Sequence, residues 1–366
     1  MELTRDSAYK ALQAIFKKKI LLIIGTGASC AIDPRFGMPA LADELKKKIP
    51  GEISANAPAS AQWKTVEENL DNGKDLETSL NGINNKELLT AIIRVTGNFI
   101  AKIDRENKLK IMSGEKEPPL EKLIQAMIEG LPESDPLLDI ITPNYDLLIE
   151  HTCDKLKIPY CTGFLGGIRK PYDWDSAAAE MVYIKSLVKA KKKVEVKRLK
   201  KHIRLHKVHG SINRFGKGMQ GFEDNSLVYD NTCSDERGII TPGDTKHENV
   251  ALHYRDFFTH ADEAIPGAGA YIFVGYGFND VQIELKIKEE LGKKDKPGII
   301  ITRTLSSNAK EWLKKSKNLW AIYQETGADK NPNACIENGQ FKKPLIIQNS
   351  RIWQIDTFTK EVLQGD

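Results

Sequence analysis

Two segments of the chain carry polar side chains of the types that cleave bonds in nucleotides. Asn144 and Asp146 follow the apolar run 138–141, with one residue between them. A continued extended backbone would therefore aim an amide and a carboxylate at the same ligand. His209 follows a second predicted strand, residues 203–208, in which apolar and polar residues half alternate. Imidazole, with a pKa of about 6.5, is well suited to accept a proton at physiological pH. We predict that these three residues line one pocket.

The same residues also have structural explanations. Asn144 and Asp146 are of the types that form Asx turns or cap a helix, and a helix is predicted from about Leu147. Of the seven histidines, His209 is the one that we place in a site, with its imidazole exposed at the carboxyl edge of the sheet, whereas His202 and His206 are expected at the surface. No histidines have a metal-ligand spacing such as H-E-x-x-H, so the sequence predicts no metal.

A glycine turn precedes these segments in the chain. Five aliphatic residues lead into Gly25, Thr26 and Gly27, followed closely by Ser29. Glycines at these positions allow the close backbone approach that a pyrophosphate needs, and the following amides can point at its oxygens. A tight turn without a ligand is the alternative. Because position 30 is Cys30, the dinucleotide fingerprint G-x-G-x-x-G is not matched, which argues against a hydride-transfer dehydrogenase.

A second glycine turn, Gly275 and Gly277, follows the aliphatic run 270–274 and suits the other end of an extended ligand. Asp280 directly precedes a helix predicted over residues 281–291, and we interpret it as the N-cap of that helix. All of these polar segments follow apolar runs. That is the pattern of ligand loops at the carboxyl ends of strands in an open α/β sheet.

The elements that must position these loops alternate along the chain. Strands are predicted at 20–24, 138–141, 203–208, 239–241, 270–275 and 298–302, with helical patterns between several of them. This alternation predicts an α/β fold, a Rossmann-like parallel sheet with helices on both faces. Residues 50–135 form a mostly helical insertion in this prediction, and we expect its acidic start, residues 66–77, to pack over the mouth of the pocket.

The pattern changes near the end of the chain. Short strands are predicted at 345–347 and 352–355, and a final helix at 357–363. We therefore divide the chain into a Rossmann-type domain of residues 1–330 and a tail of residues 331–366.

Composition limits the class of protein. With 366 residues and 40% hydrophobic content, the chain can bury a large core. Its five cysteines are odd in number and never spaced as C-x-x-C, so neither a disulfide framework nor a zinc ribbon is predicted, and a reducing cytoplasmic location is expected. The apolar runs are too short to span a membrane. A net charge of +4 does not by itself imply nucleic-acid binding.

The positive charge is concentrated in residues 185–207, which contain eleven Lys or Arg against the single acid Glu195. A solvated helix and edge strand is the expected structure. A contact with DNA, or with an acidic partner subunit, is the alternative.

Four motifs in order carry a family resemblance: Gly-Thr-Gly-Ala-Ser with Gly-Met-Pro after it, Thr-Pro-Asn-Tyr-Asp, His-Gly-Ser, and Val-Gly-Tyr-Gly-Phe-Asn-Asp. Together they resemble the SIR2 family, in particular its bacterial SIR2-like branch found in anti-phage defence. The matched stretches lie between about residues 21 and 282. The resemblance implies a Rossmann-like domain that binds NAD and cleaves the bond between nicotinamide and ribose.

The resemblance also implies residue roles. Asn144 would orient the nicotinamide ribose and the attacking water, Asp146 would meet the carboxamide, and His209 would act as the base. The remaining positions would bind the rest of NAD, with the phosphates and ribose held by Gly25, Thr26, Gly27 and Ser29 and the adenosine half by Gly275 and Gly277.

Protein-deacylating sirtuins carry a zinc module with two C-x-x-C pairs, which this chain lacks. Water is then the expected acceptor, and the implied activity is NAD⁺ glycohydrolase (NADase), with deacylation less favoured. Chains of this size in the branch resemble the partner of a HerA-type hexameric ATPase. This implies a homo-oligomer that depletes NAD to abort phage growth. Alternatives are a sensor that binds NAD or an ADP-ribose derivative, and a DNA-acting subunit of the same assembly.

Overall fold

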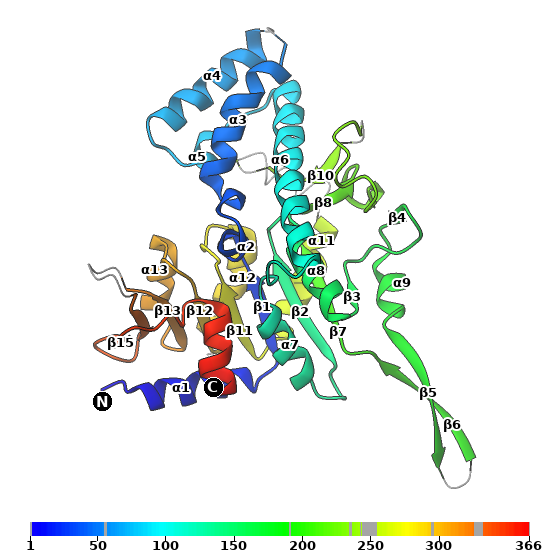
Figure 1. Ribbon diagram of the computed structural model, residues 1–366, viewed down its shortest axis with the longest axis vertical. Coiled ribbons are helices and arrows are strands. Elements are labelled where there is room, and N and C mark those ends of the chain that lie inside the picture. Colours follow the sequence, from blue (N-terminus) through cyan, green and yellow to red (C-terminus); the bar gives the residue numbers. More distant parts are fainter. Residues whose placement is uncertain are drawn as a thin grey trace.

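The structure, a computed structural model, describes residues 2–54, 57–189, 192–233, 236–241, 243, 255–293, 296–325 and 332–365. Within this part of the chain the centre is a nine-stranded sheet in the order β15-β14-β13-β12-β11-β1-β2-β7-β3 (Figure 1). Its strands are β1 (Ile20–Ile24), β2 (Leu137–Thr142), β3 (Tyr160–Cys161), β7 (His202–Lys207), β11 (Ala270–Val274), β12 (Gly298–Ile301), β13 (Leu319–Gln324), β14 (Ala334–Asn338) and β15 (Leu345–Ile347). Neighbours from β13 to β3 are parallel, and β14 and β15 extend one edge in antiparallel fashion.

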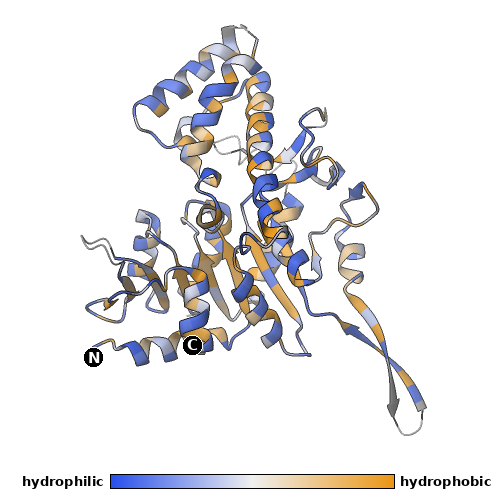
Figure 2. Cartoon of the chain, viewed as in Figure 1, coloured by the Kyte–Doolittle hydropathy of each residue, from blue (hydrophilic) through white to orange (hydrophobic). Residues whose placement is uncertain are grey.

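Alternate residues of the central strands enter two apolar layers. In β1, Leu22 and Ile24 belong to one layer, whereas Leu21 and Ile23 belong to the other. The first layer is covered by α1 (Arg5–Phe16), α7 (Glu121–Gly130), α8 (Leu148–Leu156), α14 (Ile355–Phe358) and η4 (Thr359–Gln364), and the second by α11 (Arg255–Gly267), α12 (Val281–Lys293) and α13 (Ser307–Lys315). Strands buried on both faces are continuously aliphatic, and Figure 2 shows them as a hydrophobic centre. The predicted Rossmann-like sheet with helices on both faces is confirmed.

A helical unit stands over the carboxyl ends of the strands (Figure 1). After α2 (Thr26–Ile32) and the short turn η1 (Pro34–Phe36), the chain forms α3 (Met38–Glu52), α4 (Ala57–Asp71), α5 (Leu76–Ser79) and α6 (Lys86–Met112). These four helices enclose a core of their own that includes Leu45, Trp63 and Ile92. The predicted mostly helical insertion is therefore present between β1 and β2, although α7 packs on the sheet instead. In the described ranges, no helix has the length and apolar character that crossing a membrane requires.

Two predicted strands differ from the structure. Residues 239–241 were expected in the parallel sheet, but β10 (Arg237–Ile239) pairs antiparallel with β8 (Gly210–Phe215), in a second sheet with β9 (Phe222–Glu223) and β4 (Lys170–Pro171). β10 belongs to this second sheet because the chain turns directly from β7 into β8, without a crossover helix that would return it to the parallel sheet. No strand forms at residues 352–355 either, because residues 352–354 form a turn and Ile355 begins α14.

The proposed boundary after residue 330 lies outside the described residues. The described part of the tail continues the main sheet through β14 and β15, and its final helix packs near α1.

The basic segment 185–207 is also different from the expected helix and edge strand. Most of it forms a hairpin of β5 (Val182–Lys189) and β6 (Lys192–Leu199), joined by residues 190 and 191, which lie outside the described part. The rest forms β7, whose histidines were expected at the surface. His202 and His206 are instead buried, because β7 lies between β2 and β3.

The basic side chains of β7 are paired with acidic neighbours. Arg204 donates to both carboxylate oxygens of Asp139 in β2 (Nε to Oδ1 and Nη2 to Oδ2, both 2.8 Å), and His206 Nε2 lies 3.0 Å from Asp139 Oδ1. Burial raises the pKa of Asp139, but the hydrogen bonds from His206 and Arg204 outweigh it and lower the pKa to about 2. Further along the strand, Lys207 Nζ donates to Glu150 at 2.9 Å.

Asp139→Asn is expected to lower the free energy of unfolding by about 3 kcal/mol at neutral pH, because it leaves the buried His206 and the half-buried Arg204 without the carboxylate that pairs with both. The folded-state pKa lies below the ordinary value of about 3.9, so the carboxylate contributes stability above about pH 4 and loses it as the pH falls toward 2. Urea unfolding of both proteins at neutral and acidic pH measures this. A difference in stability that does not shrink on acidification contradicts the assignment.

Candidate functional site

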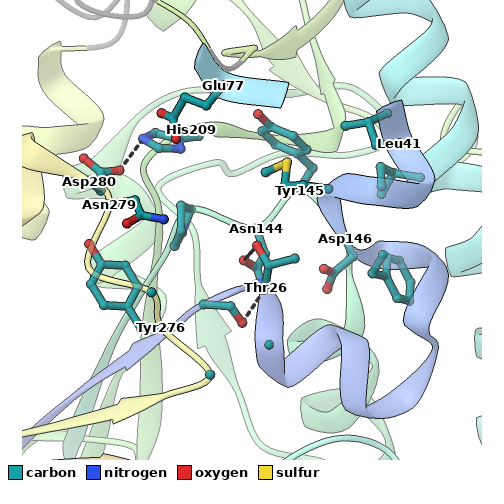
Figure 3. A pocket seen from close by; sticks show the side chains of 18 of the residues that line it. Thr26, Leu41, Glu77, Asn144, Tyr145, Asp146, His209, Tyr276, Asn279 and Asp280 are labelled. Atoms are coloured by element: carbon teal, nitrogen blue, oxygen red, sulfur yellow. Dashed lines mark hydrogen bonds and ion pairs between the residues drawn. The ribbon is translucent and has the colours of Figure 1, made fainter. Parts of the chain in front are cut away.

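A cavity of about 320 Å³ lies where the strands of the main sheet end, under the helical insertion (Figure 3). It is bounded by the turns after β1, β2, β7 and β11, which are the segments selected from the sequence. Of the nine predicted site residues, all except Ser29 line it: Gly25, Thr26, Gly27, Asn144, Asp146, His209, Gly275 and Gly277.

The two glycine turns cross each other in direct contact. Gly27 donates its N–H to the carbonyl of Gly275 at 2.9 Å. A Cβ added at Gly25 would lie 2.5 Å from that carbonyl oxygen, and one added at Gly275, where φ is +58°, would lie 2.3 Å from the backbone nitrogen of Ala28. Side chains would therefore push β1 and β11 apart. The glycines are required by the crossing of the two turns, and the amide of Gly27 is already used within the fold.

Asn144 is held in one orientation. Its Nδ2 donates to the carbonyl of Gly25 at 3.1 Å and to Ser29 Oγ at 2.9 Å. Its Oδ1 accepts a long hydrogen bond, 3.4 Å, from Thr26 Oγ1, which also lines the cavity (Figure 3). Because both donors of the amide are used inside the protein, the oxygen is the atom available to a ligand.

Ser29 lies behind the cavity wall and supports two site residues. It is buried, and its hydroxyl donates to Asp146 Oδ2 at 2.7 Å while it accepts from Asn144. The sequence placed Ser29 against phosphate or ribose. The structure gives it the position of a residue that fixes the amide and the carboxylate relative to each other.

Asp146 combines the two interpretations that the sequence left open. Its Oδ1 accepts the N–H of Leu148 at 3.2 Å, which is an Asx turn at the start of α8, and the residue also lines the cavity. Burial raises the pKa of Asp146, and the nearby positive charge of Lys207 opposes this only in part.

His209 faces the cavity from the turn between β7 and β8. It was expected to be exposed at the edge of the sheet, but it is buried and its Nε2 lies 2.7 Å from Asp280 Oδ2 (Figure 3). The other oxygen of Asp280 accepts the N–H of Gln282 at 3.2 Å, at the start of α12. Asp280 is thus a helix cap, as predicted, and also the partner of the histidine, which the sequence did not reveal.

The insertion forms the opposite wall of the cavity. Met38 and Leu41 from α3, Glu77 from α5 and Ile100 from α6 all line it, and Glu77 and Leu41 are labelled in Figure 3. The expectation that the acidic start of the insertion packs over the mouth is confirmed at Glu77. The described residues contain no group of three or more His, Cys, Asp or Glu side chains arranged to hold a metal ion.

Comparison with known families agrees with this geometry. The model of the SIR2-like domain family matches residues 139–322, half of the chain. The chain belongs to the SIR2-like family. The match includes Asn144, Asp146, His209 and the second glycine turn, and it begins after the insertion that separates them from the first turn. Proteins of this family use NAD as a substrate.

A solved structure described as "Structural Basis for the Mechanism and Regulation of Sir2 Enzymes" is similar over 83% of this chain and 89% of that chain, with 13% sequence identity and a TM-score of 0.39. A search of curated proteins gives no match.

Proposed function

We propose that this SIR2-like protein is an NAD⁺ hydrolase that cleaves the nicotinamide–ribose bond and releases nicotinamide and ADP-ribose. One observation carries the proposal: Asn144 and the His209–Asp280 pair, from loops far apart in the sequence, face one cavity between two crossing glycine turns. Membership of a family that uses NAD supports the choice of substrate.

The arrangement suits the chemistry of this bond. Nicotinamide leaves with the electron pair of the C–N bond, so the ribose carbon gains positive character and needs a positioned acceptor more than a strong acid. In our proposal Asn144 Oδ1 orients the ribose and the attacking water, His209 takes the proton from that water, and Asp280 stabilises the resulting imidazolium. Asp146 binds the carboxamide of the leaving group.

The remaining polar positions would bind the rest of the dinucleotide. Gly25, Thr26 and Gly27 are assigned to the phosphates and ribose, and Gly275 and Gly277 to the adenosine half. Because the amide of Gly27 donates to Gly275, the hydroxyl of Thr26 is the group of the first turn that we favour for a direct contact.

Asp280→Asn is expected to lower kcat about 100-fold while KM stays nearly constant, because the histidine loses both its fixed tautomer and the anion that stabilises its protonated form. Asparagine retains an oxygen for the N–H of Gln282, so the cap of α12 is preserved. Steady-state kinetics together with thermal unfolding separate the two roles. An unchanged kcat in a folded variant would remove Asp280 from the mechanism.

Product analysis distinguishes hydrolysis from deacylation. The purified chain is incubated with NAD in the presence and absence of an acyl-lysine peptide, and the ADP-ribose products are identified by mass spectrometry. We expect free ADP-ribose in both reactions and no acylated ADP-ribose. Acyl transfer that requires the peptide would instead support a deacylase.

At the level of the cell, we propose that the protein is a homo-oligomeric effector of anti-phage defence that depletes NAD together with a HerA-type hexameric ATPase. The motifs shared with the anti-phage branch support this proposal. Co-purification with such an ATPase, and NAD levels during infection of cells that carry both genes, test it. A sensor that binds NAD without turnover needs no base, and the buried His209–Asp280 pair favours the enzyme.

A further inference from the structure

A two-stranded ribbon stands apart from the body of the protein. β5 and β6 pair residue for residue, from Val182 opposite Leu199 to Lys189 opposite Lys192, and they form a sheet of their own in the described part of the chain. Figure 1 shows the ribbon extending away from the main sheet. An isolated hairpin is at best marginally stable in water. Contact with a partner would therefore stabilise the ribbon.

The ribbon is strongly cationic. Residues 182–199 contain seven Lys or Arg and one acid, Glu195, a net charge of +6, whereas the whole chain carries +4. In the described part, Lys185, Lys193, Lys197 and Arg198 are exposed and form no ion pair within the described residues. The cations of β7 differ, because Arg204 and Lys207 are paired with carboxylates. The unneutralised charge of the basic segment is thus concentrated on the ribbon.

The shape of the ribbon matches a groove of duplex DNA. Its strands of eight residues are about 26 Å long, and the major groove, about 12 Å wide, admits a two-stranded β-ribbon. Tyr183 lies directly opposite Arg198, and Ile184 opposite Lys197, so cationic and apolar side chains share each face. Exposed fractions of 41% for Tyr183 and 61% for Ile184 leave apolar surface for contacts with bases or sugars.

We propose that the β5-β6 ribbon binds duplex DNA in a groove, with Lys185, Lys193, Lys197 and Arg198 contacting phosphates. This site is separate from the NAD cavity and does not depend on the proposed hydrolase activity. The large positive charge with a single acid favours a polyanion over a second copy of the chain as the occupant.

The test is the affinity of the full chain for a labelled 30-base-pair duplex, measured by fluorescence anisotropy over a series of salt concentrations. The variant carries Lys185→Glu, Lys193→Glu and Lys197→Glu. A matched control carries Lys310→Glu, Lys314→Glu and Lys317→Glu, three exposed lysines remote from the ribbon in sequence, with the same change in net charge. The ribbon variant is expected to bind the duplex at least about tenfold more weakly. The slope of log K against log salt concentration is expected to become shallower by about 0.9 for each phosphate contact removed.

The control is expected to retain most of the affinity. Equal losses in both variants, or no salt-dependent binding by the wild-type chain, overturn the proposal. Sedimentation of the same proteins without DNA adds a second readout. If the wild-type chain is an oligomer and the ribbon variant is not, while the DNA affinity is unchanged, the ribbon is an interface between copies and the proposal is wrong. Unchanged thermal unfolding shows that the variants are folded.

Discussion

Replacing His209 with alanine is expected to reduce nicotinamide release from NAD by about 10²- to 10⁴-fold, the range that a positioned general base contributes. The imidazole is buried at the cavity, and its Nε2 is 2.7 Å from Asp280, so the protein holds it in one orientation. Single-turnover measurement of nicotinamide release gives the effect on the chemical step. NAD affinity measured by calorimetry is expected to change much less.

Two further variants make the His209 result interpretable. Because alanine leaves the Asp280 carboxylate without its histidine, His209→Gln, which keeps a hydrogen-bonding group there, tests whether lost activity reflects lost folding. His260→Ala is the matched control, since His260 is partly exposed, pairs with Glu263 and does not line the cavity. Wild-type activity in His209→Gln or His209→Ala would exclude the histidine as the base.

Replacing Asn144 with alanine is expected to lower kcat about 10²- to 10³-fold, as loss of one preorganised polar group at a reacting centre commonly does. Both hydrogens of the amide bond to Gly25 and Ser29, which leaves Oδ1 directed toward Thr26 and the cavity. The expected defect is therefore in turnover, with NAD still bound. Kinetics and calorimetry on the same preparation measure both quantities.

Ser29→Ala serves as the companion variant. It keeps Asn144 but removes the hydroxyl that joins it to Asp146, so a smaller loss of kcat, about tenfold, is expected if Ser29 positions the amide. Activity in Asn144→Ala equal to that of the wild type would mean that the asparagine only stabilises the turn.

The meeting of Asn144, Asp146 and His209 was predictable from the sequence. Clustered aliphatic residues indicate the strands of a parallel sheet, and polar residues that follow such strands meet at one edge of the sheet. The glycine turns were recognised for the same reason. Glycine is needed there because the backbones of Gly27 and Gly275 contact each other, and this contact exists because β1 lies beside β11. The order of the strands cannot be predicted from either segment alone.

The contact between His209 and Asp280 could not be predicted from the residues around either position. The sequence around Asp280 contains a helix-cap pattern, and one carboxylate oxygen does cap α12, but the second oxygen is directed by strand order to a residue from another loop. Ser29 was likewise assigned to a ligand, because the family resemblance implied a binding role for the whole first glycine turn. Neither residue spacing nor composition predicts that a hydroxyl group will hydrogen-bond to two side chains behind the cavity wall.

The basic segment was misjudged for a different reason. Because of its lysines, neither β5 nor β6 has a purely apolar face. The pairing of these two strands was therefore not predicted. His202 and His206 were assigned to the surface by their basic neighbours, although β7 occupies an interior position in the sheet. Charge in a sequence predicts exposure well only where no carboxylate on an adjacent strand, such as Asp139, neutralises it.

Free nicotinamide produced from NAD by the purified chain, measured beside Asn144→Ala and His209→Ala, tests the central claim most directly. We expect nicotinamide and ADP-ribose in equal amounts from the wild-type protein, alone or with a HerA-type ATPase and DNA, and almost none from either variant. Release at the wild-type rate in both variants would place the chemistry elsewhere. No release by the wild-type chain under any of these conditions, with NAD still bound, would contradict the assignment as a hydrolase.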